Sequence, residues 1–146
     1  MTFRPIEFGS DAFQQECALR HCVLRLPLGL SLYEEDLSGE ALQQHFGIFD
    51  GAELVACVIA VAVAPDEAKI RQMAVEPRHQ GRNLGRRLMC ELEAHLAAGG
   101  VARASLHARA TAVGFYQKLG YQTTGGEFIE VGIPHFKMDK RLTSAA

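Results

Sequence analysis

The order of hydrophobic patterns along the chain predicts an α/β (α+β) fold, a mixed and mostly antiparallel sheet with flanking helices. A strand, a helix and a hairpin come first, a strand–helix–strand unit occupies residues 69–108, and a second hairpin closes the chain. The chain has 146 residues and is 48% hydrophobic, which is typical of one globular domain. We assign that domain to residues 1–142 and expect 143–146 to be a loose C-terminal tail.

The N-terminal part predicts a strand at residues 2–8, followed by a helix. Ser10 or Asp11 can cap this helix, because a short polar side chain accepts a hydrogen bond from its first free N–H groups. The helix is expected to run to about residue 26. Apolar residues at i, i+3, i+4 and i+7 predict its core-facing stripe as Leu19, Cys22, Val23 and Leu26.

A loop at residues 27–37 and a short helical stretch at 39–45 lead to the first hairpin. Its strands are residues 46–49 and 52–63, and Asp50-Gly51 between them predicts a type I′ turn. The second strand is apolar on both faces, as is typical of a central strand covered on both sides.

The next strand, residues 69–77, ends at a proline and carries an irregularity. Its apolar residues change from an even position, Ile70, to the odd positions Met73 and Val75. A strand has a strict period of two, so the change predicts a β-bulge.

The long helix that follows is indicated by a leucine at every fourth position, Leu84, Leu88, Leu92 and Leu96. Its expected N-terminus carries Arg82, Arg86 and Arg87, which oppose the positive end of the helix dipole. An anion bound to the free N–H groups would resolve that conflict. Gly81 and Gly85 allow a phosphate to approach the backbone. The segment therefore predicts a pyrophosphate-binding turn.

This turn resembles the coenzyme A-binding motif of the GCN5-related N-acetyltransferase (GNAT) superfamily, [RQ]-x-x-G-x-[GA]. Gln80 matches the first position and Gly85 the last, whereas Asn83 replaces the usual middle glycine. Asparagine tolerates left-handed backbone angles better than other residues with a side chain, so the turn is expected to keep its shape. The predicted bulge resembles that of the superfamily's fourth strand, whose backbone pairs with the pantetheine arm and polarises the thioester.

Two further segments carry the resemblance. Residues 112–121 resemble the family signature A-x-x-F-Y-x-K-x-G-[FY], although Arg109 stands where the family usually has asparagine. Residues 128–138 resemble the segment F-x-E-x-G-I-P-H-x-x-M of an uncharacterised bacterial subgroup. The resemblance implies a strand order and helices like those predicted above, with residues 1–142 as the GNAT domain.

The resemblance implies an acyltransferase that moves acetyl from acetyl-CoA to a primary amine by direct attack in a ternary complex. Tyr116 would be the general acid, although an aromatic pair with Phe115 in the core is the simpler alternative. Backbone N–H groups of residues 73–75 would stabilise the oxyanion. The residues expected to bind the coenzyme are Met73, Ala74, Val75, Gln80, Gly81, Arg82, Asn83, Leu84, Gly85, Arg86, Arg109, Phe115, Tyr116 and Lys118.

The general base stays open among His107, Glu127, Glu130 and His135, with an ordered water as a further alternative. The acceptor amine, a small molecule or a peptide, is equally open. Arg20 and Arg25 are candidates for binding an acidic substrate group, and an ion-paired helix face is the simpler interpretation. The acidic run 34–36 is a candidate for a cationic substrate, or a solvated loop.

Composition and charge argue against several other classes of function. Fifteen Lys and Arg residues against 17 Asp and Glu residues give a net charge of −2, which argues against general nucleic-acid binding. No apolar stretch is long enough to span a membrane, and the first residues do not resemble a signal peptide. The four cysteines lack metal or disulfide spacing, so we expect reduced thiols, no metal and a cytoplasmic protein: Cys17, Cys22, Cys57 and Cys90.

A second class of function stays open beside the enzyme. A coenzyme A-binding or sensor module without turnover would keep the phosphate turn, and the departures at Asn83 and Arg109 leave room for it. Retention of Tyr116 favours the enzyme. A homodimer is a further expectation, since many relatives pair.

Overall fold

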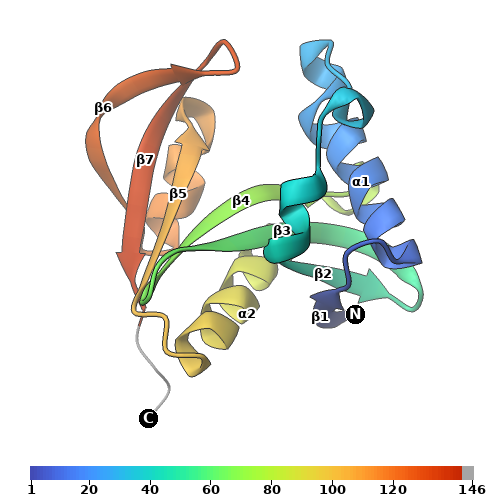
Figure 1. The fold of residues 1–146 in the computed structure, drawn as a ribbon. Helices are drawn as coiled ribbons and strands as arrows, with labels where there is room; N and C mark the ends of the chain where they lie inside the picture. The colour runs from blue at the N-terminus through green and yellow to red at the C-terminus, as the bar shows by residue number, and fades with distance from the viewer. Residues whose placement is uncertain (143–146) are drawn as a thin grey trace. The chain divides into compact units, whose positions relative to one another are not determined.

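The computed structural model describes residues 1–142, so the tail predicted at 143–146 lies outside the described residues. Seven strands in this part of the chain form one sheet in the order β1-β2-β3-β4-β5-β7-β6 (Figure 1). Strands β4 and β5 are parallel, and the pairs β1–β2, β2–β3, β5–β7 and β6–β7 are antiparallel. The strands are β1 Thr2–Ile6, β2 Gln44–Asp50, β3 Glu53–Ala64, β4 Glu67–Val75, β5 Arg103–Arg109, β6 Gln122–Glu130 and β7 Ile133–Arg141.

Three α-helices accompany the sheet in the described chain, and short 3₁₀ turns connect several elements. The helices are α1 Asp11–Leu24, α2 Leu84–Ala98 and α3 Val113–Lys118. Of residues 1–142, no helix is both long and apolar enough to cross a membrane.

The chain forms two compact units. The first contains Met1–Val61 and Gln72–Leu92, and the second contains Ala62–Arg71 and, of the described residues, 93–142. Strands β3 and β4 and helix α2 each run from one unit into the other. The assignment of residues 1–142 to a single domain stays a prediction.

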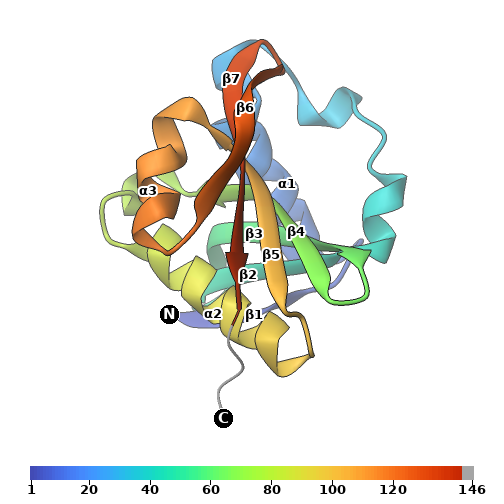
Figure 2. The ribbon, with the colours of Figure 1, turned by 90° about the vertical axis from the view of Figure 1, so that its left-hand side faces the viewer.

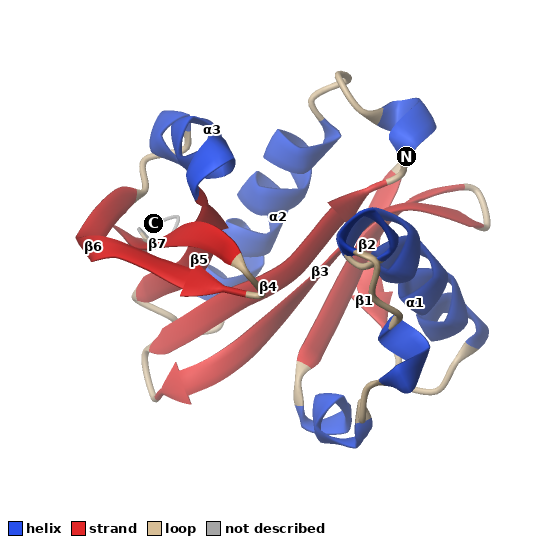
Figure 3. Ribbon diagram, turned by 90° about the horizontal axis from the view of Figure 1, so that it is seen from above, coloured by secondary structure: helices blue, strands red, loops and turns tan. Residues whose placement is uncertain are grey.

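The core of the first unit is formed by side chains of α1 and of strands β1, β2, β3 and β4. Figure 3 shows the ribbon of α1 near those of β1 and β2. Ser10 caps α1 as predicted, because its side-chain oxygen accepts a hydrogen bond from the backbone N–H of Phe13 at 3.2 Å. The predicted central strand is also confirmed, since every residue of β3 from Leu54 to Ala60 is buried. Buried apolar side chains that pack together here are Ile6, Phe13, Cys17, Leu19, Leu32, Phe49, Leu54, Cys57 and Ala74.

The predicted core stripe of α1 was wrong at two of its four positions. Cys22 and Leu26 are exposed, Val23 is half-buried, and Leu19 alone is fully buried. The buried face instead contains Phe13, Glu16, Cys17, Leu19 and Arg20. Two charged residues on this face find partners on other elements, so an apolar pattern within the helix was a poor guide to its orientation.

The β2–β3 hairpin is present, but the predicted type I′ turn was wrong. Asp50 pairs with Glu53, so the loop is Gly51-Ala52. A type I′ turn requires a positive φ at both central residues. Gly51 has φ +61°, whereas the φ of Ala52 is not positive. The helical stretch expected at residues 39–45 is a 3₁₀ turn, Ser38–Leu42, and His45 belongs to β2.

The predicted irregularity of β4 is a left-handed residue. Gln72 has φ +56°. It lies between the buried Ile70 and the half-buried Met73, where the apolar pattern changes from even to odd positions. Parallel pairing with β5 covers Glu67–Ile70. An L-residue with a side chain rarely adopts this conformation, so the bend needs support from its surroundings.

The second unit pairs β5 with the long β6–β7 hairpin, with α3 connecting β5 to β6 (Figure 2). Its core includes Leu96, Leu106, Tyr121 and Met138. The pairing of β6 and β7 shifts between Thr124 and Phe128, so β6 bulges there.

We expect Val131→Asn to stabilise the protein by about 1 kcal/mol. Glu130 pairs with Ile133, so Val131 and Gly132 form the turn, with φ +47° and +74°. A β-branched residue is strained at positive φ, whereas asparagine is favoured at the first position of such a turn. The side chain of Val131 is 61% exposed, so little packing is lost.

Urea unfolding followed by circular dichroism measures this change. Ile129→Asn is the matched control, because Ile129 is equally exposed but lies in β6, where asparagine should give no gain. A stabilisation of the control as large as that of Val131→Asn would contradict the strain argument.

Candidate active site

The predicted phosphate turn connects β4 to α2 within the first unit. The side-chain amide of Gln80 donates to the carbonyl of Val75 at 3.1 Å and so ties the turn to the end of the strand. Gly81 and Asn83 both have left-handed backbones, with φ +81° and +61°. Asn83 therefore does what the sequence suggested for it, and its carbonyl accepts the hydrogen bond from the N–H of Arg87 at 3.0 Å.

Most cations around this turn are already paired. Arg78 contacts Glu53 and Glu76, and His79 contacts Glu76 at 2.8 Å. The hydrogen bond with His79, together with those from Arg78, holds the pKa of the Glu76 carboxyl below its usual range. Arg87 pairs with Glu91 and donates to the carbonyl of Met1.

Arg82 and Arg86 are different, because neither side chain has a hydrogen bond or ion pair with any residue in the described part of the chain. Both are exposed. The first N–H groups of α2, from Leu84 to Arg86, precede the helical hydrogen bonds and need an outside acceptor. A Cβ added to Gly81 would meet no atom within 4 Å, so the turn also has open space beside it. Two free guanidinium groups beside free N–H groups fit a phosphate-bearing ligand.

Strand β4 leads into this turn through Met73, Ala74 and Val75. Ala74 is buried, and its two neighbours are half-buried. Their backbone follows directly after the left-handed Gln72.

Tyr116 lies on α3 in the second unit. Its ring makes edge contacts with Phe115 and Tyr121, at centroid distances of 5.0 and 5.9 Å. Its hydroxyl forms no hydrogen bond to any residue among 1–142. Burial raises the pKa of Tyr116 to about 12. Phe115 is exposed and Tyr116 is half-buried, so this aromatic pair does not lie in the core, and the phenol keeps its proton at neutral pH.

The side chains of Arg109 and Lys118, two further expected coenzyme contacts of this unit, have no hydrogen bond or ion pair with the described residues. Arg109 ends β5 opposite His135 of β7, and Lys118 ends α3 with its side chain exposed.

Three of the four candidate bases lie together in the second unit. Glu130 on β6 contacts the Nδ1 atom of His107 on β5 at 3.0 Å and the Nε2 atom of His135 on β7 at 3.6 Å. The Nδ1–H of His135 donates to the carbonyl of Ile133 at 2.7 Å, so its tautomer is determined by the backbone. Phe128 packs against both imidazole rings. The fourth candidate, Glu127, lies in the bulge of β6 without an ion pair to the described residues.

Residues 31–142 match the family model of the acetyltransferase (GNAT) domain. The chain belongs to the GNAT acetyltransferase family. It is 37% identical to YyaT of Bacillus subtilis (strain 168) over 76 residues, which are 52% of this chain and 51% of YyaT. The chain thus spans about half the length of this curated relative.

Solved structures confirm the fold of this GNAT protein. Escherichia coli ElaA superposes with a TM-score of 0.81 at 22% identity, covering 96% of this chain and 99% of ElaA. An aminoglycoside 6′-N-acetyltransferase complexed with coenzyme A superposes with a TM-score of 0.79 at 17% identity, covering 100% and 99% of the two chains. The predicted mixed, mostly antiparallel sheet with flanking helices is confirmed.

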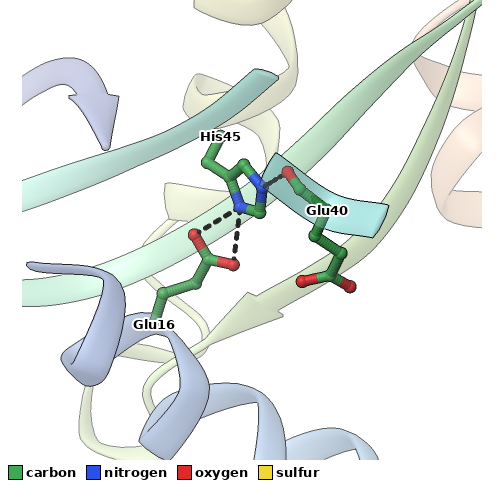
Figure 4. A group of neighbouring side chains, drawn as sticks. All are labelled: Glu16, Glu40 and His45. Carbon is green, nitrogen blue, oxygen red and sulfur yellow. Dashed lines mark hydrogen bonds and ion pairs between the residues drawn. The ribbon is translucent and has the colours of Figure 1, made fainter. Parts of the chain in front are cut away.

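This GNAT domain also contains a buried charge cluster that the sequence analysis did not identify. Arg20 of α1 is fully buried and donates to Glu16 at 2.9 Å and to both oxygens of Glu40, at 2.8 and 2.7 Å. His45 of β2 completes the cluster through Glu16 (Figure 4). The ion-paired interpretation of Arg20 is confirmed, and a fully buried guanidinium is not available to an acidic substrate. The i, i+4 spacing of Glu16 and Arg20 was the one local signal of this pair.

Glu16, Glu40 and His45 offer ligand atoms within 4.8 Å of one another, a spacing that can suit a metal ion. The guanidinium of Arg20 bonds to both carboxylates and compensates their charge. The guanidinium of Arg20 therefore already supplies a positive charge to these two carboxylates.

Arg25, the second candidate for an acidic substrate, pairs with Glu35 through two hydrogen bonds at 2.6 and 3.2 Å. The hydrogen bond from Arg25 lowers the pKa of Glu35. Arg25 and Arg20 also both donate to the side-chain oxygen Oε1 of Gln72, at 3.2 and 3.4 Å.

We expect the free energy of unfolding to fall as the pH rises through the pKa of His45. Both ring nitrogens face acceptors, the Glu16 carboxylate at 2.9 Å and the Glu40 carbonyl at 2.9 Å, so the imidazolium is the form that both bonds favour. Burial by itself would lower the pKa of His45, but these bonds and the Glu16 charge outweigh it and raise the pKa above its usual 6.5. Below pH 6.5 the protonated His45 contributes its full stabilisation to the fold. This contribution is lost as His45 deprotonates at higher pH.

Urea unfolding at several pH values from about 6 to 8.5 tests this dependence, in a range centred on the ordinary histidine pKa and its upward shift. His45→Gln is the control, since it cannot titrate and should be less stable at pH 6 and flatter across the range. A wild-type stability that rises with pH over this interval would contradict the assignment.

Proposed function

We propose that this GNAT protein transfers acetyl from acetyl-CoA to a primary amine by direct attack in a ternary complex. One observation carries the proposal: Arg82 and Arg86 have no acidic partner in residues 1–142 and stand beside the free N–H groups of α2. Coenzyme A carries a pyrophosphate that suits such donors. The coenzyme A complex of the aminoglycoside relative supports this choice of ligand.

Within the proposal, the turn at residues 80–86 binds the pyrophosphate and the backbone of Met73, Ala74 and Val75 faces the thioester. The amine nitrogen forms a bond to the thioester carbonyl carbon, the C–S bond breaks, and the thiolate takes a proton from Tyr116. Arg109, Phe115 and Lys118 contribute further contacts with the coenzyme. A covalent route through Cys17 or Cys57 is disfavoured, because burial raises the pKa values of both thiols.

We assign the proton acceptor to His107, supported by Glu130 and His135. The Nε2 atom of His107 has no hydrogen-bond partner in the part of the chain that the structure describes, whereas Nδ1 contacts Glu130 at 3.0 Å. A carboxylate at Nδ1 holds a histidine in the tautomer that accepts a proton at Nε2. His135 is 5% exposed and has its Nδ1 held by the backbone, so we assign it the role of orienting Glu130.

The proposal is tested by coenzyme A thiol release from acetyl-CoA with polyamines, amino sugars, arylalkylamines, amino acids and short peptides. Arg82→Ala and Arg86→Ala should each weaken coenzyme affinity by about 10-fold, as expected for the loss of one charged hydrogen bond. Arg78→Ala is the matched control, because Arg78 is exposed on the same turn but already paired.

Turnover with one class of amine would establish the enzyme and identify its acceptor class. Binding of acetyl-CoA without turnover on any amine would instead favour the coenzyme A-binding or sensor module, which no observation here favours. Absence of binding would reject both. We also propose that the protein is cytoplasmic, which cell fractionation would test. We propose that it forms a homodimer, which light scattering would test.

A further inference from the structure

We propose that Gln72 is a positioning residue, through which the buried charge cluster of α1 holds the backbone of Met73–Val75 in place for the reaction. The inference rests on the proposed function, because it concerns the strand that faces the thioester. All the groups involved belong to the first unit.

The left-handed backbone of Gln72 needs an external support. Gln72 has φ +56°, a conformation that glycine adopts easily and a residue with a Cβ does not. Such a residue persists where its surroundings determine its conformation more strongly than its own preference. Gln72 is half-buried, so its surroundings are protein rather than bulk water on much of its surface.

The support comes from two arginines on α1 and its C-terminal end. Arg20 Nε and Arg25 Nη2 both donate to the Oε1 atom of Gln72, at 3.4 and 3.2 Å. The backbone carbonyl of the same residue accepts a weak hydrogen bond from the buried thiol of Cys57, at 3.9 Å. Gln72 is thus held at its side chain and at its backbone.

The two donors are themselves immobilised. Arg20 is fully buried, and three hydrogen bonds to Glu16 and Glu40 determine the plane of its guanidinium. Arg25 is held by Glu35 through two hydrogen bonds. A planar guanidinium group with several fixed contacts has little freedom to move. Its hydrogen bond to Gln72 therefore restricts where this residue of β4 can lie relative to α1.

This arrangement explains why a charge cluster lies in the core of the unit. Its members come from α1, the 3₁₀ turn at Ser38–Leu42, β2 and β4, and the last of these leads directly to Met73. The cluster therefore connects the folding of the N-terminal helix to the geometry of the strand that the reaction uses. Catalysis depends steeply on such geometry, since misplacement by about 1 Å can lower a rate by about 100-fold.

Four variants test the inference. Gln72→Met keeps the length of the side chain but has no strong acceptor, and Gln72→Glu keeps an acceptor for both arginines. Gln72→Gly removes the backbone strain together with the contact. Glu34→Gln is the matched control, since it removes an exposed carboxylate beside Glu35 whose side chain has no hydrogen bond or ion pair with the described residues.

Two readouts separate this inference from the proposed function. Amide hydrogen exchange of residues 73–75 in the free protein needs no turnover. The kinetic readout is kcat against the KM for acetyl-CoA, because the phosphate turn binds the coenzyme without Gln72. We expect Gln72→Met and Gln72→Gly to exchange faster at these amides and to lower kcat by about 10-fold, with KM changed by less than about 3-fold. Gln72→Glu and Glu34→Gln should retain most of kcat.

Unchanged exchange in Gln72→Met would overturn the inference, whether or not the protein turns over. Faster exchange with an unchanged kcat would overturn its catalytic part, and wild-type kinetics in Gln72→Gly would show that the contact is dispensable. A wild-type protein without turnover would reject the proposed function instead, and the exchange measurement would then still decide whether Gln72 holds the strand.

Discussion

Tyr116→Phe is expected to lower kcat by about 100- to 10,000-fold, the range typical for the loss of a general acid or base. The substitution removes only the hydroxyl, and the ring can keep its contacts with Phe115 and Tyr121. Since that hydroxyl has no hydrogen bond within residues 1–142, the fold should be as stable as the wild type. Affinity for coenzyme A, measured by calorimetry, should change by less than about 3-fold.

The pH profile adds an independent check on Tyr116. A group whose pKa is about 12 stays protonated at all lower pH values, so its ionisation should cause no fall in kcat between about pH 7 and 10. Tyr33→Phe is the control, because this tyrosine is 63% exposed and lies outside the proposed machinery. Full activity in Tyr116→Phe would reject the general-acid role and leave the tyrosine a purely structural one.

Arg20→Met is expected to destabilise the first unit by about 3–5 kcal/mol, the cost of breaking a buried ion pair on one side. The variant leaves the carboxylates of Glu16 and Glu40 buried with only His45 to compensate them. Their desolvation is then no longer offset by hydrogen bonds from the guanidinium. Urea unfolding followed by circular dichroism measures the loss.

Two comparisons make the result for Arg20 specific. Arg25→Met should cost less than about 1 kcal/mol through its ion pair, because Glu35 is largely exposed. Adding Glu40→Gln to Arg20→Met should recover part of the lost stability, because one buried charge is removed. A loss below about 1 kcal/mol in Arg20→Met would mean that the cluster is not the stabilising element that its geometry indicates.

Local features of the sequence predicted much of the turn between β4 and α2. The residue type of Asn83 indicated a left-handed backbone, and the structure has φ +61° there. The leucine stripe predicted the buried face of α2, where Leu84, Leu88, Leu92 and Leu96 are all buried. These features depend on short-range sterics and on a helical period of 3.6 residues, so a short segment contains the information.

The orientation of α1 could not be predicted in the same way. An apolar stripe was expected to face the core, yet Glu16 and Arg20 are buried and Cys22 is exposed. Burying a charge is unfavourable unless a partner is present, and the partners Glu40 and His45 are 20 or more residues away along the chain. The hydrogen bonds of Gln72 to α1 are of the same long-range kind.

By itself, the sequence determined the family of this protein, the order of its strands and helices and the turn with Arg82 and Arg86, because each is indicated by residues close together in the chain. Tertiary structure alone decided which charges are buried around Arg20. It also decided that His107, Glu130 and His135 meet across three strands. The physical reason is that strand register and helix orientation, not local pattern, determine which distant polar groups come close enough to compensate one another.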